Sequence, residues 1–285
     1  MHMPTFYNQA TLTYNGTTVN SNIVSGELAE TLSVTKNALV DFYSPDTSLT
    51  YVVSIINTGS TPYTGLTVTD NLGEYPFEDE TRAPLAYTDD SLFYLVNGIP
   101  QPRPVVTDSS PLTVTGISVP AGGNAVLIYQ TTLTEFAPLA PESSIINEVT
   151  VSGTGISELN TTETVTVREE ALLTITKSLS PTTVPENGQL TYTFVIENRG
   201  NAPIVATDNA VITDAFDPIL ENLMVTFNSE AWSTPANYAY DEETGVFTSI
   251  PGQITVPAAT YVQDPATGAW TVTPGMATLT VTGNI

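Results

Sequence analysis

The sequence predicts an all-β chain, and three observations lead to this prediction. Apolar residues alternate with Thr and Ser over many short stretches, which is the pattern of a strand with one buried face. The chain contains 21 Pro and 18 Gly, many of them in turn signals such as NTGSTP and DPATG between these stretches. Helical periodicity is not evident in any segment. Short strands joined by turns therefore account for the whole chain.

An internal repeat divides the chain into two halves. LSVTK, ending at Lys36, matches LTITK, ending at Lys177, and LTYVVSIINTG matches LTYTFVIENRG, each pair being 141 positions apart. GLTVTD, ending at Asp70, matches AVITD, ending at Asp214, after three additional residues. Each half is long enough to bury its own core. We therefore predict two tandem immunoglobulin-like β-sandwiches.

The predicted organisation follows from this repeat. The polar segment TGISELNTTETVTVREE between the two halves is expected to form a linker or an extended strand. The predicted parts are an N-terminal donor strand at 1–19, a linker at 20–30, a first sandwich at 31–155, a linker at 156–170 and an incomplete second sandwich at 171–285.

The repeat is out of phase with the chain, and this predicts self-assembly. The first half continues into SSIINEVTVSG, a closing strand with no counterpart in the second half, but YNQATLTYNG near the start matches it and puts Asn8 in the place of Asn147. An open sandwich leaves backbone groups unpaired, so another strand must fill it. We expect the N-terminal strand of a second molecule to do so, giving a head-to-tail homopolymer. The expected donor residues are Phe6, Asn8, Ala10, Leu12 and Tyr14.

Composition excludes several classes of function. The net charge of −24, from 30 acidic and 6 basic residues, repels nucleic acid and anionic lipid. There is no Cys for disulfides or thiolate chemistry, and the one His, His2, lies at the extreme N-terminus, so we predict no metal, no cofactor and no enzymatic turnover. No apolar run approaches the ~20 residues that span a bilayer, and the first residues lack the features of a signal peptide.

The two lysines of the chain occupy the same place in the two repeats. With the motifs TK, LTYT, N.G, VTD and N.A.V, the sequence resembles the conserved-repeat domains of Gram-positive surface proteins. It also resembles the bacterial surface modules, pilins and adhesins among them, that form spontaneous Lys–Asn isopeptide bonds. This resemblance implies an intramolecular bond between Lys36 and Asn147, with Asp70 as the assisting acid.

By the same resemblance, Lys177 would bond to Asn8 of a neighbouring subunit, with Asp214 as its acid. Burial favours a neutral lysine and a protonated carboxyl group, which are the forms that this reaction requires. The bond forms once, without turnover. Two alternatives remain at this site: Asn284 as an intramolecular partner of Lys177, and Glu197 as the acid, although Ile56 stands in its place in the first repeat.

Other candidate residues point to structure rather than chemistry. Two acidic groups without the spacing of a calcium loop are expected to be solvated turns, and the two tryptophans of the second half are expected to pack in a core or hairpin. Sequons occur at two positions and carry no weight if the source is bacterial, as the resemblance implies. These residues are Asp89, Asp90, Asp241, Glu242, Glu243, Trp232, Trp270, Asn15 and Asn160.

The leading functional prediction is a structural subunit of a cell-surface or spore-surface fibre. The alternative is an adhesin or stalk in which the enlarged second half, with YAYDEETG and the tryptophans, binds a host or matrix molecule. An enzyme is the third choice, because no nucleophile and base pair is recognisable. A surface anchor protein is a further partner, which the sequence does not identify.

Overall fold

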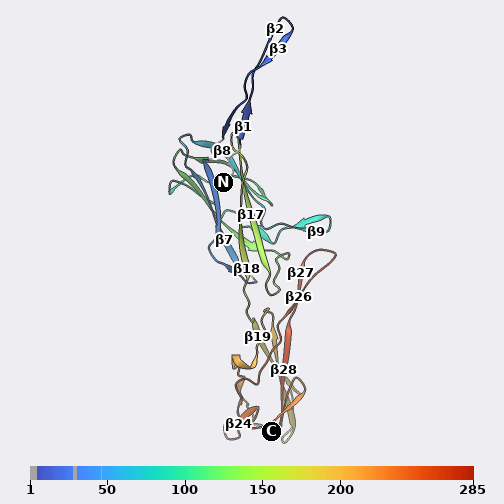
Figure 1. Cartoon of the computed structure of the whole chain (residues 1–285). Helices are drawn as coiled ribbons and strands as arrows, with labels where there is room; N and C mark the ends of the chain where they lie inside the picture. Colours follow the sequence, from blue (N-terminus) through green and yellow to red (C-terminus); the bar gives the residue numbers. More distant parts are fainter. Residues whose placement is uncertain (1–4, 28–30, 46) are drawn as a thin grey trace.

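The computed structural model describes residues 5–27, 31–45 and 47–285, and within these ranges the prediction of an all-β chain is confirmed. One short 3-10 turn, η1 (Ala206–Asp208), is the sole helical element there. In the same ranges no helix has the length and apolar character needed to cross a bilayer. Figure 1 shows three parts along the chain, which are a thin N-terminal arm, a first group of sheets and a second group of sheets.

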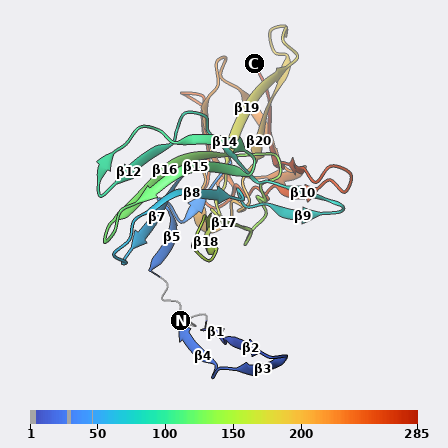
Figure 2. The ribbon, with the colours of Figure 1, turned by 90° about the horizontal axis from the view of Figure 1, so that it is seen from above.

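The N-terminal arm is a hairpin of four short strands. It pairs β1 with β4 and β2 with β3, and all of its described side chains up to Ser25 are exposed. Asn15 and Gly16 form the turn, both with positive φ (46° and 78°), as a two-residue hairpin turn requires. Figures 1 and 2 draw the arm apart from the sheets. Its strands are β1 (Thr5–Asn8), β2 (Thr11–Tyr14), β3 (Thr17–Asn20) and β4 (Val24–Glu27).

This hairpin differs from the predicted single donor strand at 1–19 and linker at 20–30. Residues 17–27 pair back on the first strand, because Asn15–Gly16 is a strong hairpin signal between two alternating segments. Residues 1–4 and 28–30 of these predicted segments, and His2 with them, lie outside the described residues.

The first group of strands forms two facing sheets. The first sheet has the order β13 (Ile99–Pro100), β12 (Phe93–Val96), β16 (Asn124–Leu133), β7 (Ser48–Asn57) and β5 (Leu32–Ala38), with β11 (Leu85–Tyr87) also on β16. The second has the order β14 (Val105–Ser109), β15 (Leu112–Val119), β8 (Tyr63–Asp70), β17 (Ser144–Ser152), β18 (Leu159–Val167) and β6 (Phe42–Tyr43). A separate ribbon pairs β9 (Tyr75–Phe77) with β10 (Glu80–Arg82). We call the two facing sheets the first sandwich.

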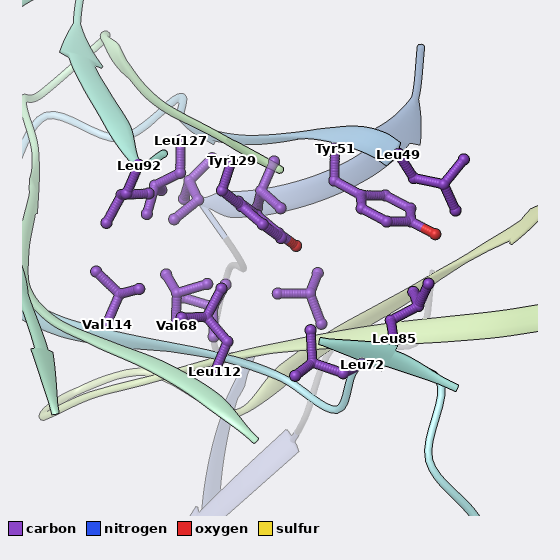
Figure 3. Close-up of a cluster of buried hydrophobic side chains, with 14 of the residues drawn as sticks. Leu49, Tyr51, Val68, Leu72, Leu85, Leu92, Leu112, Val114, Leu127 and Tyr129 are labelled. Carbon is purple, nitrogen blue, oxygen red and sulfur yellow. The ribbon is translucent and has the colours of Figure 1, made fainter. Parts of the chain in front are cut away.

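Alternating side chains build the core of the first sandwich. On β7, Leu49, Tyr51, Val53 and Ile55 are fully buried, while the residues between them face outward. Figure 3 shows Leu49 and Tyr51 pointing from one layer toward residues of the other, such as Leu112. The segment predicted as a linker at 156–170 contains β18, whose Val165 and Val167 enter this core. Polar residues on its solvent face hide this strand in the sequence.

The second group of strands has a core of its own. One sheet has the order β19 (Leu173–Ser180), β20 (Gln189–Asn198), β28 (Gly275–Asn284), β22 (Glu221–Phe227) and β23 (Glu230–Trp232). The other has three strands, β21 (Thr213–Ala215), β25 (Val246–Ser249) and β24 (Tyr238–Asp241). Phe194, Phe216, Phe247 and Leu279 are among the buried residues between them. We call this group the second sandwich.

The two sandwiches correspond strand by strand up to one edge. β19, β20 and β28 stand where β5, β7 and β16 stand, and β21, β25 and β24 correspond to β8, β15 and β14. In the first sandwich the free side of β8 is taken by β17, which is covered in turn by β18. Within the described residues, no strand takes the free side of β21. The second sandwich is therefore open where β17 and β18 close the first.

A hairpin inserted in the second half contacts the first sandwich. It pairs β26 (Thr260–Gln263) with β27 (Trp270–Thr273). Arg82 Nε donates a hydrogen bond to the carbonyl oxygen of Thr267 at 2.8 Å, and the Trp270 amide donates to the carbonyl oxygen of Glu135 at 2.8 Å. Gln263 Nε2 donates to the Tyr75 hydroxyl at 2.9 Å. These bonds brace the two sandwiches against each other.

Candidate functional site

The first candidate site lies in the core of the first sandwich. Lys36 is on β5, Asp70 ends β8 and Asn147 is on β17, and alternation turns all three inward. Lys36 Nζ lies 2.6 Å from Asp70 Oδ2, and the two side chains are 0% and 2% exposed. A buried ion pair of this kind contributes little net stability, since desolvation offsets the attraction. The structure thus brings a lysine and a carboxyl group together in a core that also buries the side chain of Asn147.

The amide of Asn147 is only half satisfied. Its Oδ1 accepts a hydrogen bond from the Gly73 amide at 3.1 Å, whereas its buried Nδ2 has no hydrogen-bond partner. A buried donor without a partner costs ~1–3 kcal/mol and is unusual in a native core. An amide whose oxygen is hydrogen-bonded and whose amino group is unpaired is compatible with loss of that amino group as ammonia.

Burial tunes the lysine toward its neutral form. It lowers the pKa of Lys36 from 10.5 to about 8, and nearby Asp70 opposes this effect without overcoming it. Glu163 and Glu148 oppose it further. Loss of charge from Lys36 is therefore far easier here than in water, and the neutral amine is the nucleophilic form.

Two tyrosines complete the surroundings of this pair, and the sequence did not single them out. The Tyr129 hydroxyl donates a hydrogen bond to Asp70 Oδ2, the oxygen that also accepts from Lys36. The Tyr51 ring centroid lies 4.7 Å from Lys36 Nζ, in cation–π range. Burial raises the pKa of both tyrosines, so they stay neutral. Figure 3 shows the two hydroxyl groups directed into the space between the layers.

Gly73 is a further site residue that the sequence analysis missed. It has φ +73°, and a Cβ there would lie 2.6 Å from Ile145 Cγ2, so glycine is required by both conformation and space. Its amide points at Asn147 Oδ1. A NLG turn after a strand was the available signal, but its target lies 74 residues away.

The second candidate site repeats part of the first in an open setting. Lys177 Nζ pairs with Asp214 Oδ2 and lies 4.3 Å from the centroid of the Tyr192 ring, as Lys36 lies over Tyr51. The Lys177 side chain is 39% exposed. Val281 faces Tyr192 where Tyr129 faces Tyr51, so the second carboxyl group has no equivalent tyrosine donor. The lysine and the carboxyl group of the second site lie together, but no candidate asparagine amide lies beside them.

None of the candidate amides lies at Lys177 within one subunit. Asn8 is exposed on β1, where it pairs with Val24. Asn284 pairs with Gln189 and Glu221, away from the β28 residue Leu279 that shares the row of Lys177. It also alternates with the buried residues of β28, so it lies on the outward face.

The alternative acid of the second site is also turned away from Lys177. Glu197 lies on the outward face of β20 and pairs with Arg199 at 3.7 Å. Asp214 is therefore the carboxyl group that the structure places at Lys177.

The row of residues around Lys177 is uncovered. On β5 the inward row is Leu32, Val34, Lys36 and Ala38, and its counterpart on β19 is Leu173, Ile175, Lys177 and Leu179. Leu32 is 7% exposed, whereas Leu173 is 44% exposed. β18 lies along β5 in the first sandwich, where Glu163 Oε1 accepts a hydrogen bond from the Ala38 amide, whereas nothing in the described chain covers the second row. We call the second row the open row.

The remaining candidate residues have ordinary structural surroundings. Asp241 Oδ1 accepts from the amides of Glu243 and Thr244, and Asp90 pairs with Arg103. Trp232 stacks on Phe227 with ring centroids 5.0 Å apart, and Trp270 lines a pocket beside Tyr75 and Pro138. Among the described residues, no three metal-binding side chains gather at one point. Asp89, Glu242, Asn15 and Asn160 lie in turns or on exposed strand positions.

No protein-family model and no curated protein matches the sequence. Similar solved structures include the major pilin subunit of Bacillus cereus, with 12% identity over 94% of this chain and 70% of that one and a TM-score of 0.38. The pilus backbone of Streptococcus pneumoniae has 12% identity over 85% of this chain and 55% of that one, with a TM-score of 0.34. The collagen adhesin of S. aureus has 15% identity over 53% of this chain and 55% of that one, with a TM-score of 0.32.

The chain spans about half the length of the pneumococcal and staphylococcal proteins. Two of these proteins are pilins and one is a collagen adhesin. At such low identities and TM-scores, the similarity carries no conclusion about the activity or the partners of this chain.

Proposed function

We propose that this chain is the structural subunit of a surface or spore-appendage fibre. It consists of two tandem immunoglobulin-like sandwiches, and the N-terminal arm of one subunit completes the second sandwich of the next. The observation that supports this most directly is the open row on β19, which is uncovered where the equivalent row on β5 is buried. The exposed arm, which resembles the closing segment of the first sandwich, supplies a matching piece.

The free energy of the exposed surfaces favours this strand exchange. The open edge of β21 and the open row leave unpaired backbone groups and apolar side chains in water, and the arm exposes Phe6, Leu12 and Tyr14. Joining the two surfaces buries apolar area at ~25 cal/mol per Å² and pairs both edges. The contact joins two different surfaces, so repetition yields an open filament.

The arrangement of the first site supports an intramolecular amide bond between Lys36 and Asn147. A proton passes from Lys36 Nζ to Asp70 Oδ2 along their 2.6 Å contact, leaving an amine and a carboxylic acid. The amine attacks Cγ of Asn147, and the Gly73 amide and protonated Asp70 stabilise the charge that develops on Oδ1. The Cγ–Nδ2 bond then breaks. Nδ2 leaves as ammonia with its own two hydrogens and one proton from Nζ, the other proton lost by Nζ remains on Asp70, and Lys36 and Asn147 are joined by an amide.

The same reaction is proposed between subunits at the second site. Asn8 occupies in the arm the place that Asn147 holds on β17, so a docked arm would present its amide to Lys177 with Asp214 as the acid. While the site is open, solvent keeps the lysine hydrated. Docking would remove that water, so covalent closure follows assembly rather than preceding it.

Removal of the arm is expected to leave subunits that do not assemble. A chain without residues 1–27 should elute as a monomer in size-exclusion chromatography and show no filaments by electron microscopy, since the open edge has no donor. The double variant Leu12→Ser and Tyr14→Ser should behave alike, because it removes apolar area from the arm. The matched control, Thr11→Ser and Thr13→Ser, should still polymerise. Filaments from the arm-free chain would refute strand donation.

Burial of Lys36 predicts a pH-dependent stability in a subunit that cannot form the bond. In Asn147→Ala the amine stays free, with a folded pKa of about 8 against an ordinary 10.5. Between these values the unfolded chain binds more protons than the folded chain. The contribution of Lys36 to the free energy of unfolding should therefore rise by about 2–3 kcal/mol as pH increases from about 8 to about 10.

Urea denaturation over this pH range measures the effect. The double variant Asn147→Ala and Lys36→Met lacks the titrating amine and keeps the tyrosines, so it isolates the lysine contribution. An equal pH dependence in both variants would show that the lysine titrates as an ordinary surface group.

A further inference from the structure

The arm of the chain is a two-stranded hairpin, and this changes what a neighbouring subunit can receive. We propose that the whole hairpin of one subunit enters the second sandwich of the next subunit, an inference that rests on the fibre proposed above. β1 and β2 would take the place of β17, and β3 and β4 the place of β18. The occupant is thus a second copy of this chain, and it delivers two strands rather than one.

The pairing register carries this inference. In the arm Asn8 pairs with Val24 and Phe6 with Gly26. In the first sandwich Asn147 pairs with Glu163 and Ile145 with Val165. Each residue of the second set lies 139 positions after its counterpart in the first. The strand pair β1–β4 therefore has the register of β17–β18 around the asparagine, which a one-residue slip would destroy by turning Asn8 to the other face.

The side chains of the two hairpins are complementary in size at the inner end. Ile145 and Val165 are both fully buried in the first sandwich. In the arm their counterparts are Phe6 and Gly26, and the Phe6 ring lies so close over Gly26 that a Cβ there would be 2.5 Å from Cζ. In the arm a large side chain, Phe6, packs against a glycine, whereas two side chains of medium size meet at the equivalent positions of the first sandwich. The two strands of the arm are thus fitted to each other as one unit before any docking.

Covering the open row requires the second strand. In the first sandwich β18 reaches across to β5, where Glu163 Oε1 accepts a hydrogen bond from the Ala38 amide at 3.0 Å. A strand in the place of β17 pairs with β21 but leaves the side toward β19 open. By the offsets of 139 and 141, Val24 would lie against Leu179 where Glu163 lies against Ala38. The apolar contact of Val24 with Leu179 between two subunits would thus replace the polar contact that Glu163 makes within one subunit.

Cysteine cross-linking tests this arrangement in the full chain, which has no Cys of its own. All subunits carry Lys177→Met, so that no covalent bond of the protein itself holds them together. Subunits with Val24→Cys are mixed with subunits carrying Leu179→Cys and treated with a short bismaleimide. We expect a cross-linked dimer by SDS gel. The matched control, Ser25→Cys with Leu179→Cys, should give at least tenfold less, because Ser25 lies on the opposite face of β4.

A second pair reports on the first strand alone. Subunits with Asn8→Cys and Lys177→Met should also cross-link to subunits in which Lys177 is replaced by Cys instead of Met, and circular dichroism should confirm strand content in every variant. If this pair cross-links while Val24→Cys and Leu179→Cys do not, a single strand is donated and the hairpin inference is wrong, but the fibre proposal stands. If neither pair cross-links, strand donation itself fails and the hairpin inference fails with it.

Discussion

Filaments of the wild-type chain are expected to survive boiling in SDS as ladders or as material too large for the gel. Asn8→Ala and Lys177→Ala should each reduce them to one monomer band, which is a change from almost no free subunit to almost all. The reason is that an amide between Asn8 and Lys177 resists detergent and heat, whereas hydrogen bonds and apolar contacts do not. Both variants should still form filaments by electron microscopy, because docking of the arm does not need the bond.

The controls for this experiment come from the same chain. Asp214→Asn should also abolish resistance to boiling, since it removes the proton acceptor beside Lys177. Asn284→Ala should leave resistance intact, because Asn284 lies on the outward face of β28. Reductant should have no effect in a chain without Cys. Wild-type filaments that dissolve to monomers in hot SDS would reduce the second site to a packing contact.

The intact mass of a parent subunit that carries Lys177→Met, and so cannot form the intermolecular bond, is expected to be one ammonia below the mass of its sequence. Lys36→Met and Asn147→Ala should each restore the full mass, and Asp70→Asn should do so too, because an amide cannot take the proton of Lys36. The bond would close a loop of roughly a hundred residues, which in the chain-entropy description stabilises the folded state by about 4–5 kcal/mol. Loss of the bond should therefore lower the midpoint of urea denaturation markedly.

Glu163→Gln is the matched control for these variants. It keeps an oxygen that can accept from the Ala38 amide and removes a nearby charge without touching the reacting groups. Its mass should show the same loss of ammonia as the parent. A parent mass equal to that of the unmodified sequence would exclude the bond, and the Lys36–Asp70 pair would then be a buried ion pair held for structural reasons alone.

The two lysine sites differ in one respect that matters for assembly. Lys36 is enclosed by residues of its own sandwich, so the proposed bond would need nothing beyond folding. Lys177 remains partly solvated until another surface covers it. Under the proposed function, this difference sets the order in which the two bonds form. The bond of Lys36 would form in the isolated subunit, and the bond of Lys177 would form only after two subunits have docked.

The sequence by itself determined the class of the fold and the equivalence of the two halves. Alternation of apolar and polar residues reports directly on burial, because strand periodicity is local, and the 141-residue offset places Lys36 and Lys177 on matching strands. The family resemblance assigned Asp70 and Asp214 to them, since each is the last residue of a repeated sequence motif. These predictions use information that lies within a few residues of each group.

Only the tertiary structure decided the rest. Tyr129 and Gly73 reach the Lys36 site from strands and turns far along the chain, and nothing in their local sequence marks them as partners of Asp70 and Asn147. β18 was not recognised as a strand in the sequence, because its buried valines, Val165 and Val167, lie near its C-terminal end and most of its other residues are polar. The pairing of β3 and β4 with the first strands turned a predicted linker into half of a hairpin. Each of these features depends on long-range contacts, which set burial and hydrogen bonding independently of local pattern.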